Sequence, residues 1–359
     1  MPKIDTYLKK LHEMGGSDLH MLAGHPPKFR VHGALEPIDK PLSNEACEGL
    51  LFEIIDKRRK KIFDETMDTD FAYEVPNVSR FRVNYFRQQH GMGAVFRTIP
   101  TKIRTLQDLG VPETCYRFTE LRSGLVLVTG PTGSGKSTTL AALINHINEN
   151  HRKHLITIED PIEYTHRNKK CVITQREVGE DAISFSRALR AAMREDPDAI
   201  LVGEMRDLET ISLAITAAEL GIVVFATLHT NSAGKTIDRI IDVFPEDQQE
   251  QVRTMLSVSL QGVVSQLLLR TADGQGRVPA NEILFGSAAL ANIIREGNVA
   301  KVQTYLEGGR GEGMQLMDDS IMARLKAGLV SPNEAYMKAA DKTKFEALLA
   351  RGGGAKGGH

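Results

Sequence analysis

The nine-residue stretch GPTGSGKST, residues 130–138, contains the most specific chemical motif of the sequence. It fits the pattern G-x-x-x-x-G-K-[ST] of phosphate-binding loops. Glycines let backbone N–H groups curl around phosphate oxygens, and the helix that follows adds the positive end of its dipole. The lysine of such a loop reaches the β- and γ-phosphates, and the serine ligates Mg²⁺. We therefore expect ATP and Mg²⁺ to bind here, through Gly130, Pro131, Thr132, Gly133, Ser134, Gly135, Lys136, Ser137 and Thr138.

Hydrolysis also needs acidic groups that orient water and hold the metal, and two acidic clusters follow apolar stretches. In ITIEDPIEY, Glu159, Asp160 and Glu163 come at the end of a predicted strand, where Pro161 places Glu163 in a loop. In ILVGEMRD, Glu204 directly follows a second apolar run, which is the position of a Walker-B acid. We expect Glu204 to bind Mg²⁺, directly or through water, with Glu159 and Asp160 as further metal candidates. The alternative for each carboxylate is a surface acid or a helix cap.

A histidine, His229, ends a third apolar run in the stretch FATLHTNSAGKT. A histidine at a strand end can donate a hydrogen bond to a γ-phosphate. Taken alone, such a residue is more often a capping or core histidine. Its place beside the other polar strand ends favours the phosphate contact.

Short apolar runs alternate with helical segments in the part of the chain that carries these groups. The runs cover residues 125–129, 155–158, 199–203 and 222–228. Near-continuous apolar strands are buried on both faces, as in a parallel sheet, and ligands bind at the carboxyl ends of such strands. The sequence therefore predicts an α/β nucleotide-binding core. Beyond Pro245 we expect helices, apart from a strand near 278–284.

The first 100 residues predict a smaller domain of antiparallel strands and helices. Helices are expected over residues 3–14 and from Ser43 to Phe63, and strands over 28–38 (with a turn near Gly33), 70–75, 80–88 and 94–99. Arg82 falls on the polar face of a strictly alternating strand. The basic run Lys57–Lys61 is expected to be a solvated face that suits the C-terminal dipole of its helix, with a nucleic-acid patch as the alternative.

Composition excludes several classes of protein. The chain has 359 residues, which suggests at least two domains, and 45 basic against 46 acidic side chains, which argues against bulk electrostatic binding of nucleic acid. The three cysteines, Cys47, Cys115 and Cys171, form no CxxC pair, so a zinc knuckle or a disulfide framework is not expected and a cytosolic location fits. Because no run of 18 apolar residues occurs, any membrane association should be peripheral, through a partner.

Longer motifs along nearly the whole chain resemble those of the secretion-type motor ATPases of type II secretion and type IV pili, and above all their pilus retraction subgroup. Besides the phosphate loop and ITIEDPIEY, the matching blocks are SDLHMLAGHPPKFRVHG (17–33), FRVNYFRQQHGMGAVFRTIP (81–100), QREVG (175–179), ALRAAMREDPDAILVGEMRDLETI (188–211) and ATLHTNSAGKTIDRIIDVFP (226–245). The resemblance implies a hexameric motor that hydrolyses ATP to drive pilus retraction, and so pilin disassembly and twitching motility.

The resemblance also implies an organisation along the chain. A PAS-like α+β domain is expected over 1–100, a linker over 101–118, a RecA-like ATPase core over 119–285, and a helical C-terminal region over 286–350, followed by a disordered tail over 351–359. The expected assembly is a homohexamer at the cytoplasmic face of the inner membrane. Its expected partner is a PilC-like platform protein of that membrane, and no nucleic-acid partner is expected.

Individual site residues follow from the same resemblance. Glu163 is expected to be the catalytic base that polarises water, Glu204 the acid near Mg²⁺, and His229 the histidine near the γ-phosphate. Arg82 and Arg97 match the N-terminal arginines that reach nucleotide phosphates in this family. For Arg97 the alternative is a solvated strand arginine.

Three other functions remain open on the sequence. The absence of a tetracysteine site and of an additional N-terminal domain favours retraction over pilus assembly. The retraction subgroup carries the motif AIRNLIRE, whereas residues 289–296 here read ALANIIRE. This difference leaves an accessory paralog of the retraction motor as an alternative. For the stretch itself, the structural alternative is a plain packing helix. A RecA-like nucleic-acid translocase and a nucleotide-binding regulator with slow turnover are the remaining alternatives.

Overall fold

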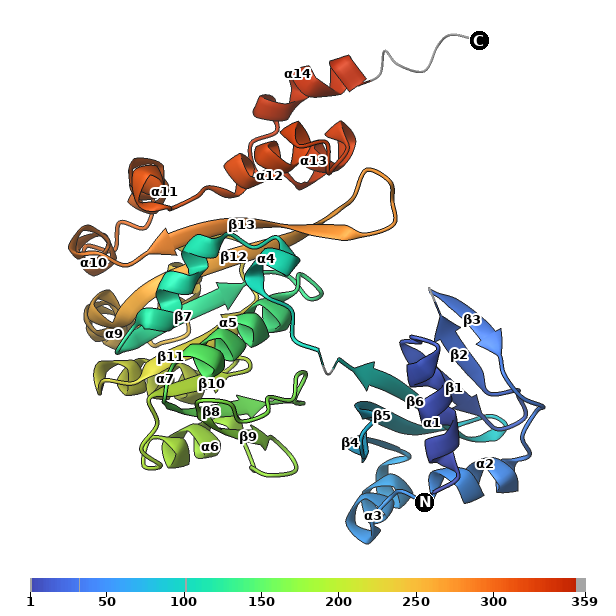
Figure 1. The fold of residues 1–359 in the computed structure, drawn as a ribbon. Coiled ribbons are helices and arrows are strands. Elements are labelled where there is room, and N and C mark those ends of the chain that lie inside the picture. Colours follow the sequence, from blue (N-terminus) through green and yellow to red (C-terminus); the bar gives the residue numbers. More distant parts are fainter. Residues whose placement is uncertain (1, 32, 101, 353–359) are drawn as a thin grey trace, which may run out of the picture. The chain divides into compact units, whose positions relative to one another are not determined.

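A computed structural model of the chain describes residues 2–31, 33–100 and 102–352. It shows a two-domain α/β protein. One compact unit comprises the residues up to Lys102 together with Glu163–Thr165, and the other comprises Ile103–Ile162 together with His166 onward (Figure 1). No helix within the described ranges is long and apolar enough to cross a membrane.

The first unit is built on a six-stranded sheet in which every neighbouring pair is antiparallel. The strands run in the spatial order β3 (Ala34–Pro37), β2 (Lys28–Val31), β1 (Asp18–Leu22), β6 (Gly91–Ile99), β5 (Ser79–Gln88) and β4 (Asp68–Val75). In β5, Phe81, Val83 and Tyr85 are buried and Arg82 is exposed, as the alternation predicts. The sheet is accompanied by α1 (Ile4–Glu13), α2 (Asn44–Leu51) and α3 (Lys57–Thr66).

The single helix expected from Ser43 to Phe63 is wrong, because the chain breaks it into α2 and α3. Ser43 caps α2 as expected, but Asp56 caps a new helix by accepting a hydrogen bond from the Arg59 N–H at 2.8 Å. The basic run Lys57–Lys61 therefore begins a helix, where the dipole opposes positive charge. Ion pairs with Asp56, Asp64 and Glu65 offset it.

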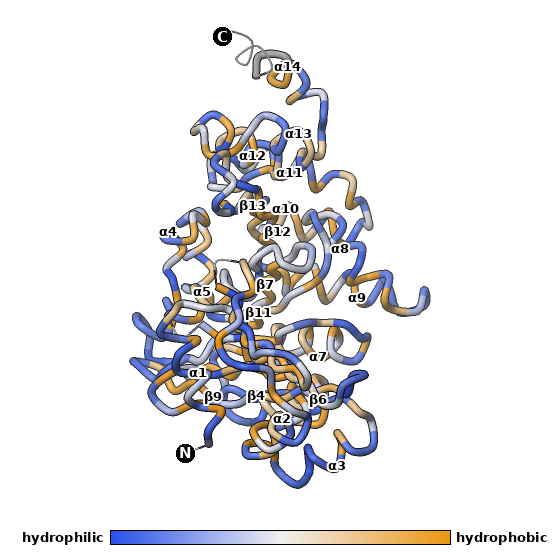
Figure 2. The backbone as a smooth tube through the Cα atoms, turned by 90° about the vertical axis from the view of Figure 1, so that its right-hand side faces the viewer, coloured by the Kyte–Doolittle hydropathy of each residue, from blue (hydrophilic) through white to orange (hydrophobic). Residues whose placement is uncertain are grey.

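The second unit contains a seven-stranded sheet whose strands are parallel except for the last hairpin. Its order is β13 (Arg277–Phe285), β12 (Leu260–Arg270), β7 (Gly124–Thr129), β11 (Val223–Leu228), β10 (Ala199–Val202), β8 (His154–Glu159) and β9 (Val172–Glu177). Every residue of β7, β10 and β11 is buried, and the tube is mainly hydrophobic at β7 and β11 in Figure 2. The predicted parallel strands are present, whereas β9 and β12 were not predicted.

Helices cover this sheet, and one of them directly continues the phosphate-binding loop. They are α5 (Lys136–Asn150), α6 (Phe185–Ala192), α7 (Leu208–Glu219), α8 (Ala233–Asp242) and α9 (Glu246–Ser259). The stretch expected as a linker, 101–118, contains α4 (Leu106–Leu109) and the start of a 3-10 helix, η1 (Glu113–Glu120). Leu106, Cys115 and Phe118 are buried in the core of the second unit, so burial of apolar side chains holds this stretch against that unit.

The C-terminal region is helical, as expected, and has a small core of its own. It comprises α10 (Ala288–Arg295), α11 (Lys301–Gly308), η2 (Gly309–Glu312), α12 (Met317–Lys326), α13 (Pro332–Lys338) and α14 (Thr343–Gly352). Leu269 of β12 packs in one cluster with Ile321 and Phe345, which fastens the last helices to the final hairpin. Of the tail expected to be disordered, residues 351 and 352 end α14 and residues 353–359 lie outside the described part of the chain.

Candidate nucleotide-binding site

The phosphate-binding loop joins the fully buried strand β7 to α5. Gly130, Gly133 and Gly135 adopt φ angles of 147°, 77° and 86°, a region that favours glycine. The Lys136 ammonium group is buried and donates hydrogen bonds to the carbonyl oxygens of Gly130 at 2.9 Å and Pro131 at 3.1 Å. The loop therefore already curls around the lysine that is expected to bind phosphate.

Polar groups from neighbouring parallel strands meet at the carboxyl edge of the sheet. Because β7, β11, β10 and β8 are adjacent, Gly130, His229, Glu204 and Glu159 follow one another along this edge. Glu204 Oε1 lies 3.0 Å from His229 Nε2, and Glu204 Oε2 accepts a hydrogen bond from Arg206 at 2.7 Å. The structure thus brings together two residues that the sequence placed 25 positions apart.

The electrostatics of Glu204 keep this carboxylate ionised. Burial alone would raise its pKa, but the Arg206 hydrogen bond and the charges of Arg206, His229 and Lys136 outweigh burial, so the pKa lies below the ordinary value. The influence of Lys136 connects Glu204 with the phosphate-binding loop. An ionised carboxylate that is influenced by the charge of Lys136 suits Mg²⁺, which is bound through one or two carboxylates, waters and substrate phosphates. Among the described residues, no group of three or more His, Cys, Asp or Glu side chains is placed so that it could hold a metal ion by itself.

The other carboxylates of the first acidic cluster occupy different environments. Glu159 is buried and accepts hydrogen bonds from Thr157 Oγ1 at 2.7 Å and Gln175 Nε2 at 3.4 Å. Asp160 and Glu163 are exposed, and Glu163 lies in a loop, as Pro161 predicts. Glu159 is therefore bound into the sheet edge, whereas Asp160 and Glu163 face solvent.

Sequence reasoning missed the residue that anchors this loop, Glu177. Its side chain is only 3% exposed, and its Oε2 accepts a hydrogen bond from the Ile162 N–H at 3.2 Å, next to Glu163. The Glu177 N–H in turn donates to Asp181. The signal in the sequence was the QREVG block, which contains Glu177 but was used only as part of the resemblance.

The two arginines of the first unit lie directly opposite each other on paired strands, Arg82 on β5 and Arg97 on β6. Arg97 Nε donates to Asp18 Oδ1 at 2.9 Å, and Asp18 is 5% exposed. A buried carboxylate thus holds an arginine whose own side chain remains 68% exposed. Arg97 is therefore fixed at its base by an ion pair, while most of its surface stays open to solvent.

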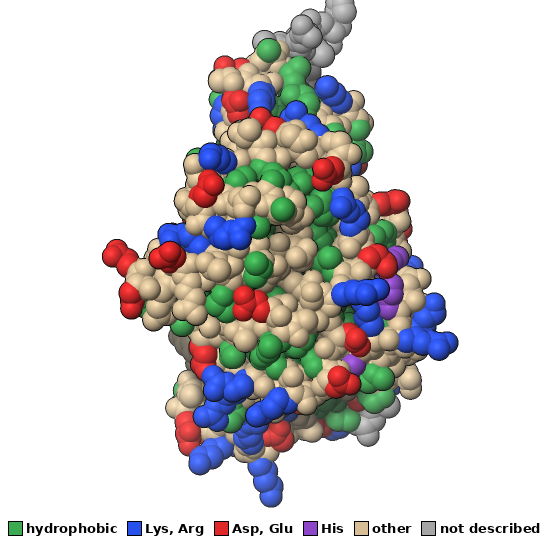
Figure 3. All heavy atoms as spheres, turned by 90° about the vertical axis from the view of Figure 1, so that its left-hand side faces the viewer, with side chains coloured by type: hydrophobic (Ala, Val, Ile, Leu, Met, Phe, Trp, Pro, Cys, Tyr) green, Lys and Arg blue, Asp and Glu red, His purple; other side chains and the backbone are tan. Residues whose placement is uncertain are grey.

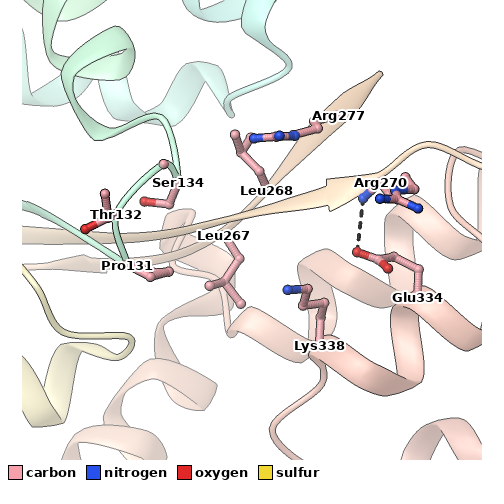
Figure 4. Close-up of a pocket in the computed structure, with 10 residues that line it drawn as sticks. Pro131, Thr132, Ser134, Leu267, Leu268, Arg270, Arg277, Glu334 and Lys338 are labelled. Carbon is pink, nitrogen blue, oxygen red and sulfur yellow. Dashed lines mark hydrogen bonds between the residues drawn. The ribbon is translucent and has the colours of Figure 1, made fainter. Parts of the chain in front are cut away.

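A pocket of about 330 Å³ lies beside the loop and was not predicted (Figure 4). The loop forms one wall, and the ends of β12 and β13 together with α13 form the rest. Its lining residues are Pro131, Thr132, Gly133, Ser134, Leu267, Leu268, Arg270, Arg277, Glu334 and Lys338. The Arg270 N–H donates to Glu334 Oε1 at 3.1 Å, which ties the strand to the helix. The pocket combines leucine side chains with cationic groups, a mixture that suits a ligand with a flat apolar part and an anionic part.

Comparison with known proteins identifies relatives along most of the chain. The type IV pilus retraction ATPase PilT of Pseudomonas aeruginosa is 52% identical over 328 residues, covering 91% of this chain and 95% of that protein. The type IV pilus ATPase PilU of the same species is 37% identical over 351 residues, covering 98% and 92%. A crystal structure of the pilus retraction motor PilT with bound ADP superposes with a TM-score of 0.90 at 43% identity, covering 96% of this chain and 99% of that one.

The family model described as "Type II/IV secretion system protein" matches residues 1–344. This match confirms the resemblance drawn from the motifs, and together with the ADP-bound structural relative it confirms the predictions of an ATPase and of nucleotide binding. The chain belongs to the Type II/IV secretion system protein family, as an ATPase of the pilus retraction type.

Proposed function

We propose that this protein is the motor ATPase that hydrolyses ATP to retract type IV pili, with pilin disassembly and twitching motility as the consequences. The observation that carries the proposal is 52% identity with a pilus retraction ATPase over nearly the full length of both chains. The accessory alternative is less well supported, because identity with PilU is 37%. We further propose a homohexameric ring at the cytoplasmic face of the inner membrane, acting on a PilC-like platform protein.

The loop residues and Lys136 are proposed to bind the phosphates of ATP. Lys136 then exchanges its bonds to the carbonyl oxygens of Gly130 and Pro131 for bonds to phosphate oxygens. Ser137 and Glu204 are proposed to hold Mg²⁺, with Asp160 and Glu159 as further candidates, and the ion would neutralise phosphate charge. His229 Nε2, which lies 3.0 Å from Glu204, is proposed to orient that carboxylate or to donate to the γ-phosphate.

Glu163 is proposed as the base that polarises water. It follows Ile162, whose N–H is held by buried Glu177, so the loop has an anchor next to the proposed base. Arg82 and Arg97 are proposed as phosphate contacts from the first unit, with Asp18 orienting Arg97.

The pocket beside the loop is proposed to receive the base and ribose of the nucleotide. Its leucines, Leu267 and Leu268, offer apolar surface to a purine. Arg270 and Arg277 offer cationic groups that stack on a base or pair with phosphate.

Steady-state ATP hydrolysis by purified wild type and Glu163→Gln tests the catalytic proposal. Loss of a general base should lower kcat at least about 100-fold while ADP affinity stays unchanged. Glu219→Gln, at an exposed glutamate that ends α7, is the matched control and should keep full activity. Turnover of Glu163→Gln near the wild-type rate would refute Glu163 as the base.

Two further measurements separate the alternative functions. Expression in a strain that lacks its own retraction motor should restore twitching, and failure to do so beside normal ATPase activity would favour the accessory role. Single-stranded DNA should leave the ATPase rate unchanged, because the formal net charge is −1 and basic and acidic side chains are interspersed on the face shown in Figure 3. A DNA-stimulated rate would favour the translocase.

A further inference from the structure

A chain of buried polar side chains connects the phosphate-binding loop with the C-terminal helices. Its central member, Gln266 on β12, is 2% exposed. Gln266 Nε2 donates to the carbonyl oxygen of Ser134 in the loop at 2.6 Å. Gln266 Oε1 accepts from Thr139 Oγ1 in the first turns of α5 at 2.8 Å. One side chain therefore holds the loop on both sides of Lys136.

The same glutamine sets how closely the loop lies against β12. A Cβ on Gly135 would come within 2.8 Å of Gln266 Nε2, and a Cβ on Gly130 would collide with the Gln266 carbonyl oxygen. Both ends of the loop thus lie directly against this residue. A shift of Gln266 has to move the loop, because protein interiors are close-packed and contain little empty space between neighbouring groups.

The chain continues from Gln266 toward α12. Asn281 on β13 is fully buried, and its Nδ2 donates to Gln266 Oε1 at 2.9 Å. The main chain of Asn281 is held from the other side, where its N–H donates to Ser320 Oγ at 3.0 Å and its carbonyl oxygen accepts from Gln315 Nε2 at 2.7 Å. Ser320 belongs to α12, so three hydrogen bonds in series connect the loop with the C-terminal helices, through Gln266 and Asn281.

Two buried atoms at this network still have hydrogen-bonding capacity. Within the described part of the chain, Ser134 Oγ and Asn281 Oδ1 have no hydrogen-bond partner. A buried polar atom without a hydrogen-bond partner costs free energy, so each of these two atoms would gain from a new partner. The two unpartnered atoms lie at the loop end and at the β13 end of the connection, where a change of hydrogen bonding on nucleotide binding would act.

We propose that Gln266 is a positioning residue for the nucleotide-binding loop and that, through Asn281, it couples nucleotide affinity to the packing of α12. The coupling operates as a change in loop geometry, and neither residue contacts the reacting atoms. This inference rests on the nucleotide binding proposed for the loop, and it adds a route by which the C-terminal helices sense or set the nucleotide state.

Titration of the full chain with fluorescently labelled ADP tests the proposal. Gln266→Met keeps the length of the side chain and removes its three hydrogen bonds, so the Kd for ADP should rise about tenfold. Gln261→Met, on the same strand but at its far end, is the matched control and should leave the Kd unchanged. Equal affinities of Gln266→Met and wild type would overturn the proposal, whereas a wild type that does not bind ADP would refute the nucleotide site itself.

A double-mutant cycle distinguishes coupling from general destabilisation. Ser320→Ala removes the partner of the Asn281 N–H on α12 and should weaken ADP binding about threefold in the wild-type background. In the Gln266→Met background the same change should have no further effect, because the connection is already broken. Independent, multiplicative effects on the Kd would overturn the coupling.

A second pair of variants keeps the test decisive if Gln266→Met does not fold. Thr139→Val removes the hydroxyl that donates to Gln266 Oε1 while keeping the shape of the side chain, and should raise the Kd for ADP severalfold. Thr139→Ser retains the hydroxyl and should bind ADP like wild type. If Thr139→Val also binds like wild type, the proposed positioning by Gln266 is wrong.

Discussion

Replacement of Gly130 by alanine tests whether the loop is held by its contact with β12 or by its backbone conformation alone. Gly133 is the matched control, since it also has a positive φ, 77° against 147° at Gly130. An added Cβ at Gly133 meets nothing within 4 Å, whereas at Gly130 it lies closer than 3.0 Å to the Gln266 carbonyl oxygen and to Ser134 Oγ. Both variants place a side chain at a positive φ, and only Gly130→Ala adds a collision.

The expected magnitudes follow from this difference. Strain of a non-glycine residue at positive φ costs about 1–2 kcal/mol, which is the whole effect expected for Gly133→Ala. At Gly130 the collision adds overpacking of about 1–3 kcal/mol, because the opposing atom belongs to a strand backbone and cannot rotate away. Since about 1 kcal/mol lowers the Tm of a unit of this size by about 2–4 °C, Gly130→Ala should unfold several degrees below Gly133→Ala.

Thermal unfolding followed by circular dichroism, with and without ADP, measures both effects. Gly130→Ala should also bind ADP more weakly than Gly133→Ala, because the displaced residue carries one of the carbonyl oxygens that Lys136 contacts. A Tm of Gly130→Ala equal to or above that of Gly133→Ala would refute the reasoning. It would mean that β12 moves freely away from the loop.

Two further predictions concern stability. Burial lowers the pKa of His166 to about 4, so its neutral form stabilises the fold above pH 6.5, and this contribution is lost as pH falls toward 4. Urea unfolding of the wild type should therefore show a free energy of unfolding about 2 kcal/mol lower at pH 5 than at neutral pH, a loss that His166→Gln lacks. An equal pH dependence of both proteins would contradict this prediction. Asp56→Ala removes the cap of α3 and should lower the free energy of unfolding of the first unit by about 1 kcal/mol. Asp64→Ala breaks only an exposed ion pair with Lys60 and should lower the same free energy by less than about 0.5 kcal/mol. Comparable losses in the two variants would show that the cap is unimportant.

The parts of the site that the sequence predicts are those with local signals. The phosphate-binding loop is one continuous motif between an apolar strand and a helix, so the nine-residue sequence of the motif is enough to predict it. Glu204 and His229 each end a fully buried strand, and adjacency of β10 and β11 in a parallel sheet was enough to bring them within 3.0 Å. The family resemblance supplied roles for Glu163 and Arg82 that no local pattern contains.

The parts that were missed depend on contacts between distant segments or on breaks without a local signal. α9 ends at Ser259 and β12 begins at Leu260, so no glycine or proline marks the change from helix to strand. The apolar run that follows reads equally well as helix, because strand identity here comes from pairing with β7. The break before α3 was hidden for a similar reason, since Asp56 stands inside a stretch with continuous helical character.

The position of β12 explains why the most consequential unpredicted residues cluster there. Pairing of β12 with β7 ends where Ser265 lies opposite Thr129, the last residue before the loop. β12 nevertheless continues to Arg270, so Gln266, Leu267 and Leu268 lie alongside the loop that follows β7. The same hairpin carries α12 and α13 through its packing and hydrogen bonds. A nucleotide that changes the loop therefore acts on a strand that is already fastened to the C-terminal helices, which gives those helices a direct physical connection to the nucleotide-binding loop.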